Sequence, residues 1–466
     1  MVDKAWNVSL TEIQKLQALD RQVHLHSFTD PQAMVQAPPF VMQKASGSQV
    51  MGQGIQLLDA MAGLGNVNIG YGRKEMAEIA YGVMRELNFY HTFAGITNPW
   101  AARLSEALMD VAPKQFNKVF FANSGSEAVE TAIKLARMYW HREGQDTKQM
   151  ILSRDFAYHG STIATSALNG LKVMHTDFNT QTDALVAHAP SPFWYRFGEE
   201  MTLEEFGLHA AKQVEEKILE IGAENIAAFI GEPVQATLGC IIPPDNYWPE
   251  IEKICRRHNI LLIADEVVTG LGRTGEWFAQ DRFNFKADIM TLAKGLSSGY
   301  QPISATLLSD RIASVVEGEQ GVLQHGFTTS GHPVACAIAT KNIMILKEEN
   351  LIPRIKNDIG PYFKAKMESL LDIPIVGEVR TCGLMMGLEI CKDQESREQF
   401  PYEYYLCQHV AQAALETGVI VRPAGNVIVA CPPFIFTHED VDALERRLRR
   451  SLEFVLGRLR SEGLMP

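Results

Sequence analysis

The sequence predicts an α/β fold built on a mainly parallel β-sheet, and three observations support this prediction. Short, almost continuously apolar segments alternate with longer amphipathic helical patterns through the middle of the chain. A strand with one solvent-exposed face alternates apolar and polar residues, and these segments do not. Both faces of the predicted strands should therefore be buried, as in a parallel sheet. Polar or glycine-rich turns follow several of these segments, at the edge where such folds bind ligands.

Length and composition restrict the class of protein. A chain of 466 residues is too long for one ordinary core and suggests two or three domains. Its 46% hydrophobic and 21% charged residues are typical of globular proteins and argue against whole-chain disorder or a fibrous repeat. The formal charge of −12 argues against nucleic acid or an anionic membrane as a partner.

The cysteines and the apolar segments predict a cytoplasmic protein. No apolar run approaches the roughly 20 residues that span a bilayer, and the first ten residues show no secretory pattern. The cysteines are odd in number and scattered, without a Cys-x-x-Cys pair, which indicates reduced thiols and no metal site. They are Cys240, Cys255, Cys336, Cys382, Cys391, Cys407 and Cys431.

The chain divides into three predicted parts: an N-terminal segment (1–66), a large α/β domain (67–333) and a C-terminal α+β domain (334–466). The first part should hold a helix at Leu10–Leu19 and a strand pair near Gln53–Asp59, with its turn at Met51–Gly54.

The middle part carries the strands of the parallel sheet. Between them we expect helices at Ser126–Arg142 and Leu203–Ile221. The predicted strands are Lys118–Ala122, Gln149–Ser153, Ile226–Gly231, Ile260–Ala264, Ile289–Leu292 and Ile303–Leu308.

The last part mixes helices and strands. A final helix should begin at the capping box Thr437-x-x-Asp440 and bury an apolar stripe, while its basic run Arg446–Arg450 forms a solvated face and no nucleic-acid site. The other predicted elements are helices Val334–Glu348 and Tyr402–Thr417 and strands near Leu384–Ile390 and Val427–Ala430.

A small-residue turn follows the first of the predicted buried strands. Ser124, Gly125 and Ser126 open the helix after Lys118–Ala122, and Ser124-x-x-Glu127 matches a capping box. Free backbone N–H groups and the helix dipole favour an anion there, so the turn could hold a phosphate. An ordinary capped helix explains the same residues.

Two carboxylates and a lysine follow other predicted strands. Asp265 and Glu266 come directly after Ile260–Ala264, where a buried carboxylate needs a cationic partner. A protonated ring nitrogen would serve, and so would a helix cap or a structural ion pair. Lys294 follows Ile289–Leu292, and a lysine there can have a lowered pKa and form a Schiff base, or can simply be solvated.

Together the turn at Ser124–Ser126, Asp265 and Lys294 predict a ligand that has a phosphate, a ring nitrogen and an aldehyde. Pyridoxal 5′-phosphate has all three. Tyr158 adds an aromatic ring that could stack on the pyridine. The residues Gly270–Gly275 form a competing G-x-G-x-x-G pattern, but the first glycine comes several residues after the strand, and a dinucleotide site would leave Lys294 without a role.

The combination of motifs resembles the class III pyridoxal-phosphate aminotransferases, the ω-amino-acid and amine:pyruvate group of fold type I. The resemblance covers nearly the whole chain and implies a seven-stranded-type sheet with a small domain built from both termini. The matching motifs are Asn123–Glu127, Tyr158–Ser161, Gly231–Val234, Ala264–Val267 with Gly270–Gly275, Ala293–Gly295, and Gly326–Thr328 with Gly331–Pro333.

The resemblance assigns roles to residues of this chain. Lys294 would be the Schiff-base lysine, and Asp265 would pair with the ring nitrogen. Val267 and Tyr158 would lie on opposite faces of the ring. The remaining cofactor residues would be Ser124, Gly125, Ser126, His159 as a loop support, Glu232 near the ring, and Thr328, which would reach the phosphate of a neighbouring subunit.

The substrate side is also implied by the resemblance. Arg422 would bind a carboxylate and swing away for an uncharged amine, with Glu232 balancing its charge in some relatives. Phe28 would wall the pocket. Gly65 stands where many relatives carry tryptophan, so the cavity should be larger here if that position lines the pocket. Thr329 stands where relatives often carry tyrosine, and both departures bear on substrate size and not on reaction type.

The implied activity is transfer of an amino group from an amine or ω-amino acid to a keto acid, most simply pyruvate, by a ping-pong mechanism. An aminomutase or a decarboxylating enzyme of the same fold is the alternative, and a scaffold protein without activity is a third. The resemblance further implies a homodimer, or a tetramer, with sites at the subunit interface.

Overall fold

The computed structural model describes residues 9–180, 185–318 and 321–465. Its centre is a seven-stranded sheet in the order β4-β10-β9-β8-β7-β5-β6. All neighbours pair in parallel except β10, which is antiparallel to both β4 and β9. The strands are β4 (Phe116–Ala122), β5 (Met150–Arg154), β6 (Val186–Ala189), β7 (Ile226–Gly231), β8 (Leu261–Asp265), β9 (Ile289–Leu292) and β10 (Ser304–Ser309).

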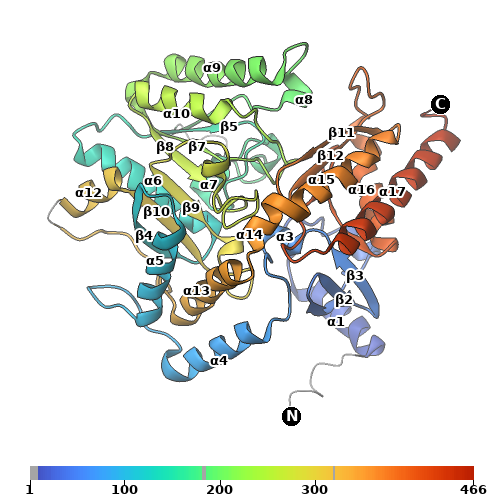
Figure 1. Cartoon of the computed structure of the whole chain (residues 1–466), viewed down its shortest axis with the longest axis horizontal. Coiled ribbons are helices and arrows are strands. Elements are labelled where there is room, and N and C mark those ends of the chain that lie inside the picture. The colour runs from blue at the N-terminus through green and yellow to red at the C-terminus, as the bar shows by residue number, and fades with distance from the viewer. Residues whose placement is uncertain (1–8, 181–184, 319–320, 466) are drawn as a thin grey trace.

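Helices cover both faces of this sheet, and this explains why its strands are apolar throughout. In β8, Leu261 and Ile263 pack in the cluster that contains helix α6. Leu262 and Ala264 point the other way, into the larger cluster that contains α9 and α10. Figure 1 shows α9 and α10 side by side at one edge of the molecule. The predicted mainly parallel α/β sheet is therefore confirmed.

The remaining helices of this part flank the sheet or connect its strands. Helix α13 packs against α4 and α5, and α12 packs against α6 and β4. The helices are α3 (Ala62–Gly65), α4 (Lys74–Leu87), α5 (Pro99–Val111), α6 (Gly125–Arg142), α7 (Ile163–Ala167), α8 (Trp194–Phe197), α9 (Leu203–Ile221), α10 (Tyr247–Arg257), α11 (Ala279–Arg282), α12 (Asp310–Gly318) and α13 (Pro333–Glu348).

Two smaller four-stranded sheets involve both ends of the chain. One has the order β1-β2-β3-β13, in which β13 pairs in parallel with β3 and so joins the C-terminal part to the N-terminal part. The other has the order β11-β12-β15-β14. The strands are β1 (Met42–Ser46), β2 (Gln49–Gly52), β3 (Ile55–Asp59), β11 (Val376–Thr381), β12 (Met386–Ile390), β13 (Val419–Ile420), β14 (Arg422–Ala424) and β15 (Val427–Ala430).

The terminal helices pack around these small sheets (Figure 1). Helix α17 begins after a capping box of Thr437 and Asp440, as the sequence predicts, and lies against α15 and α16. Its apolar stripe is buried, whereas Arg446 and Arg450 of the basic run are exposed. The helices are α1 (Leu10–Val23), α2 (Ala33–Gln36), α14 (Leu351–Arg354), α15 (Gly360–Glu368), α16 (Leu406–Glu416) and α17 (His438–Ser461).

Some predicted elements differ in extent, and others were not predicted. The helix expected over Tyr402–Thr417 is interrupted at Tyr405, whose φ of +47° separates a short 3₁₀ turn from α16. Strands β6 and β11 have no counterpart in the sequence prediction. The domain boundaries at 66 and 333 stay a prediction. No helix among the described residues is both long and apolar enough to cross a bilayer.

Candidate active site

A cavity of about 350 Å³ lies where the loops after several strands of the large sheet meet. Parallel strands bring the residues that follow them to one edge, which is why segments far apart in sequence converge here. The cavity is lined by most of the predicted cofactor residues: Ser124, Gly125, Ser126, Tyr158, His159, Glu232, Asp265, Val267 and Lys294.

Asp265 is the last residue of β8, and its carboxylate is buried and fixed by three donors. His159 Nδ1 lies 2.7 Å from Asp265 Oδ2. The backbone N–H of Val267 and the hydroxyl of Thr291 donate to Oδ1 at 3.1 and 3.2 Å. These contacts hold the carboxylate in one orientation.

His159 does more than the loop support expected from the sequence. Its backbone N–H donates to Asn169 Oδ1 at 2.7 Å, which fixes the loop, and its ring holds Asp265. The other ring nitrogen, Nε2, is buried and has no hydrogen-bond partner among the residues that the structure describes. We infer that His159 positions the carboxylate. Neither Asn169 nor Thr291 was predicted, although a threonine inside the buried strand β9 is a signal that could have been noticed.

The two neighbouring carboxylates have different surroundings. Glu266 does not line the cavity but points into the protein, where it accepts hydrogen bonds from Thr269 Oγ1 at 2.6 Å and from the backbone N–H groups of Ala279 and Gln280 at the start of α11. Glu266 therefore acts as a helix cap, which is one of the alternatives that the sequence left open. Asp265 instead faces the cavity.

Lys294 follows β9, the strand next to β8, and its amine lies in the same cavity as Asp265. Its φ of +36° is unusual for a residue with a side chain and indicates local backbone strain. Among the described residues Lys294 Nζ makes no hydrogen bond. Burial lowers the pKa of this amine, Asp265 and Glu232 oppose the shift, and the charge of Arg422 adds to it.

The turn that the sequence predicts to hold a phosphate lies at the start of α6. Ser124 caps the helix by accepting a hydrogen bond from Glu127 N at 3.2 Å. Glu127 differs from the predicted capping box, because its carboxylate accepts from Asn123 N and Nδ2 instead of from Ser124 N. The first N–H groups of the helix have no partner within the helix and remain available to an anion.

Close contacts require small residues around this turn. A Cβ at Gly125 would lie 3.2 Å from Val267 Cγ1. A Cβ at Gly160 would lie 2.5 Å from Ser126 Oγ, so the loop that carries Tyr158 can approach α6 only with glycine there. Ser126 Oγ accepts a hydrogen bond from Ser161 N at 3.1 Å.

Glu232 is a buried carboxyl held by the backbone. It accepts hydrogen bonds from Tyr158 N at 3.0 Å and Ala236 N at 3.2 Å. Burial raises its pKa to about 7. No ion pair joins Glu232 to Arg422 in the described chain, so the balancing role suggested by relatives is not seen in this conformation.

The predicted substrate residues surround the cavity rather than line it. Arg422 begins β14, and burial lowers the pKa of its guanidinium. Phe28 is largely exposed, yet its ring lies edge-on to Tyr158 with the centroids 6.3 Å apart. Thr328 is exposed and does not line the cavity of its own chain, although its neighbour Thr329 donates to Asn123 Oδ1 at 2.7 Å.

Gly65 is buried beside the cavity and has a φ of +66°. A Cβ there would be 3.5 Å from Val268 Cγ1, a residue of the cavity wall, and 3.9 Å from Cys431 Cβ. Cys431 was not predicted as a site residue. A larger side chain at Gly65 would thus project toward the cavity but would have to adopt an unfavourable backbone conformation.

The residues present fit pyridoxal 5′-phosphate. An unpaired lysine amine, a fixed carboxylate and a helix start with free N–H groups surround one cavity of sufficient size. By contrast, the Gly270–Gly275 loop lies outside that cavity and opens no helix until Ala279, while its Arg273 is fully buried and donates to Asn68 Oδ1 at 2.6 Å. Through Arg273 the loop is hydrogen-bonded to Asn68, and its position does not match that of a dinucleotide-binding loop.

Comparison with known proteins shows which family this chain resembles. The family model described as aminotransferase class-III matches residues 32–452. A putrescine–pyruvate aminotransferase of Pseudomonas aeruginosa is 42% identical over 440 residues, which cover 94% of this chain and 95% of that protein. A diaminobutyrate–2-oxoglutarate transaminase of Halomonas elongata is 38% identical over 456 residues, covering 95% and 97%. The omega transaminase from Pseudomonas jessenii in complex with PMP has a TM-score of 0.93 and 36% identity, covering 96% of this chain and 99% of that one.

The burial of Glu266 predicts a pH-dependent stability difference. Burial raises its pKa from 4.5 to about 7. Between these values the unfolded chain binds fewer protons at this carboxyl than the folded chain, so the carboxyl lowers stability as pH rises. We expect the free energy of unfolding of Glu266→Gln, minus that of the unchanged protein, to increase from pH 4.5 to about 7 and then to level off.

Urea unfolding at a series of pH values measures this difference. The matched control is Glu453→Gln, an exposed glutamate on α17, which lacks the burial that raises the pKa of Glu266. A flat profile for Glu266→Gln would contradict the assignment of a raised pKa to this carboxyl.

Proposed function

Because this chain belongs to the class-III aminotransferase family, whose members depend on pyridoxal phosphate, we propose that it moves an amino group from a primary amine or ω-amino acid to a keto acid by a ping-pong mechanism. The observation that carries the proposal is the placement of Asp265 and Lys294 at the ends of the adjacent strands β8 and β9, facing one cavity. When bound, the cofactor would supply an aldehyde for the donor amine and a ring that accepts the electrons of the breaking C–H bond.

The chain's own groups would bind and orient the cofactor. The N–H groups at Gly125 and Ser126 would hold the phosphate at the start of α6. Asp265 would keep a proton on the ring nitrogen, and His159 and Thr291 keep its carboxylate in place. Tyr158 and Val267 would hold the two faces of the ring, and Glu232 fixes the Tyr158 loop through the backbone.

Lys294 Nζ would move the proton of the reaction. Its lowered pKa favours the free amine, which can take a proton from the amine-bearing carbon of the donor and later return one. The positive φ of Lys294 turns the chain sharply after β9 and leaves the amine in the cavity near Asp265.

We propose pyruvate as the acceptor and Arg422 as the group that binds its carboxylate. Pyruvate is the acceptor in the name of the relative from Pseudomonas aeruginosa, whereas the Halomonas relative is named for 2-oxoglutarate. Arg422 has no carboxylate partner among the described residues, so a substrate carboxylate could pair with it. For an uncharged amine the long side chain would have to move aside.

We further propose that the enzyme works as a homodimer. Thr328 would supply its hydroxyl to the phosphate of the partner's cofactor, which agrees with its exposure and its place outside its own cavity. Tyr90, Phe93 and Ile96, between α4 and α5, expose apolar surface that a second subunit would cover.

The first test concerns Lys294→Ala. The variant should lose the near-visible absorbance of the bound aldehyde and at least about 10²–10⁴-fold of the rate, the usual contribution of a positioned acid–base group. Formation of one alanine per amine consumed, with pyruvate as acceptor, measures activity and separates transamination from an aminomutase or a decarboxylating reaction. Lys286→Ala, an exposed lysine far from the cavity, is the control. Undiminished turnover in Lys294→Ala would refute the proposal.

A second test concerns Arg422→Leu. We expect kcat/KM to fall about 10–100-fold for pyruvate and for ω-amino acids, because a charge-assisted hydrogen bond contributes about 1.5–3 kcal/mol. The half-reaction with an uncharged arylalkylamine should change much less. Arg450→Leu, on the exposed face of α17, is the control. Equal losses for charged and uncharged donors would argue against carboxylate binding by Arg422.

A third test concerns the space at Gly65. Gly65→Trp should lower kcat/KM for bulky arylalkylamines more than for small amines, because the side chain would project toward Val268. Gly65→Ala is the matched control, since it carries the same backbone strain at φ +66° without the bulk. If the ratio of bulky to small donors is the same in the two variants, the pocket does not extend to Gly65.

A further inference from the structure

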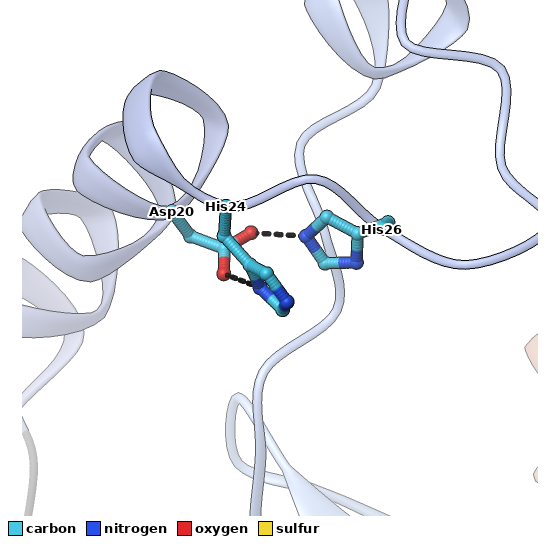
Figure 2. A group of neighbouring side chains, drawn as sticks. All are labelled: Asp20, His24 and His26. Atoms are coloured by element: carbon cyan, nitrogen blue, oxygen red, sulfur yellow. Dashed lines mark hydrogen bonds and ion pairs between the residues drawn. The ribbon is translucent and has the colours of Figure 1, made fainter.

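Two histidines and an aspartate meet at the end of the first helix, away from the cavity described above. Asp20 lies in the last turn of α1, His24 caps the helix, and His26 follows two residues later. The two imidazole rings lie with their centroids 4.4 Å apart, and the Asp20 carboxylate contacts one nitrogen of each ring (Figure 2). Its Oδ1 is 2.9 Å from His24 Nδ1 and its Oδ2 is 2.5 Å from His26 Nε2.

The chemistry of these three groups is that of a transition-metal site. One atom from each residue lies within 4.8 Å of the other two, close enough for a common ion after small side-chain movements. Two imidazole nitrogens and one carboxylate suit zinc and its neighbours, whereas magnesium and calcium prefer oxygen ligands. Three protein ligands would leave at least one position for water.

The outer nitrogen of each ring can carry the N–H of a neutral imidazole while the nitrogen that faces Asp20 binds an ion. Within the described chain, His24 Nε2 and His26 Nδ1 make no hydrogen bond. The cluster borders a hollow of about 70 Å³ that is also lined by Arg21. Arg21 Nη1 donates a hydrogen bond to the carbonyl oxygen of Val35 at 3.4 Å.

We propose that Asp20, His24 and His26 bind a zinc-type divalent transition-metal ion, and that this ion fixes the segment that carries Phe28. The ion would replace the protons that now lie between the carboxylate and the imidazoles. Because Asp20 belongs to α1 and His26 lies beyond it, binding would tie the helix to the segment that follows.

The segment after His26 carries Phe28, and an ion that fixes this segment would act on the active site through that residue. Phe28 lies two residues after His26, has a φ of +50° and is largely exposed. Its ring touches Tyr158, which lines the cofactor cavity. A ligand that restrains His26 therefore restrains an aromatic side chain that lies against Tyr158 of the cavity wall.

Other groups of the chain should not compete for the ion. All seven thiols are buried. The exposed pairs His141 with Asp146 and His438 with Asp358 each bring a single histidine to a carboxylate. Among the described residues, the cluster at the end of α1 alone gathers three such ligands. One strong site per chain is thus expected.

Zinc titration of the cofactor-loaded enzyme tests the binding. The chain must carry no affinity tag, and it is treated with EDTA and dialysed before isothermal calorimetry or competition with a coloured chelator. We expect one zinc ion per chain. His24→Gln and His26→Gln should each bind zinc at least about 100-fold more weakly, because loss of a residue that merely hydrogen-bonds to a metal ligand already lowers the affinity about 10–100-fold. His141→Gln, from a pair with one histidine, should bind zinc as the unchanged protein does.

Hydrogen exchange tests the effect on the segment. With zinc, the amides of residues 24–30 should exchange more slowly in the unchanged enzyme and in His141→Gln, but not in His26→Gln. Binding that is equally strong in both histidine variants would overturn the site, and binding without slower exchange would overturn its effect on Phe28. Neither measurement uses an amine donor or turnover, so a failure here is distinct from a failure of the transaminase proposal.

Discussion

The buried hydrogen bond between His159 Nδ1 and Asp265 Oδ2 is the contact on which the rest of the site depends. It joins the loop after β5 to the end of β8, so it fixes two walls of the cavity at once. The same loop carries Tyr158, and its approach to α6 is possible only because residue 160 is glycine. A change at His159 would therefore disturb the Asp265 carboxylate, the Tyr158 loop and the contact of that loop with the start of α6 together.

Keeping the buried groups of the site charged costs free energy when the cavity is empty. This cost favours binding of a ligand that pairs with them. Lys294 and Arg422 both have pKa values lowered by burial, and Glu232 has a pKa raised to about 7. Burial disfavours a charged group that is not fully paired. A ligand with a phosphate, a protonated ring and a substrate carboxylate would supply the missing partners, so cofactor and substrate binding should also stabilise the fold.

The sequence alone predicts those elements whose residue pattern has a single physical explanation. Apolar runs identified β7, β8 and β9, because helices bury both faces of these strands. Strand β6 escaped notice because it is short and contains His188 within an edge strand. The role of His159 and the inward direction of Glu266 depend on partners more than ten residues away, which no local pattern reveals.

The location of the substrate residues suggests how this fold separates chemistry from specificity. Asp265 and Lys294 belong to the large sheet, whose strands are fixed by packing on both faces. Phe28 follows α1, Gly65 lies in α3 and Arg422 lies in the small sheet of β14, all outside the large sheet. If the proposed roles hold, changes in these segments would alter which amine fits without moving Asp265 and Lys294. The glycine at position 65, and the His24–His26 segment beside Phe28, are therefore the places where this chain's donor preference should be set.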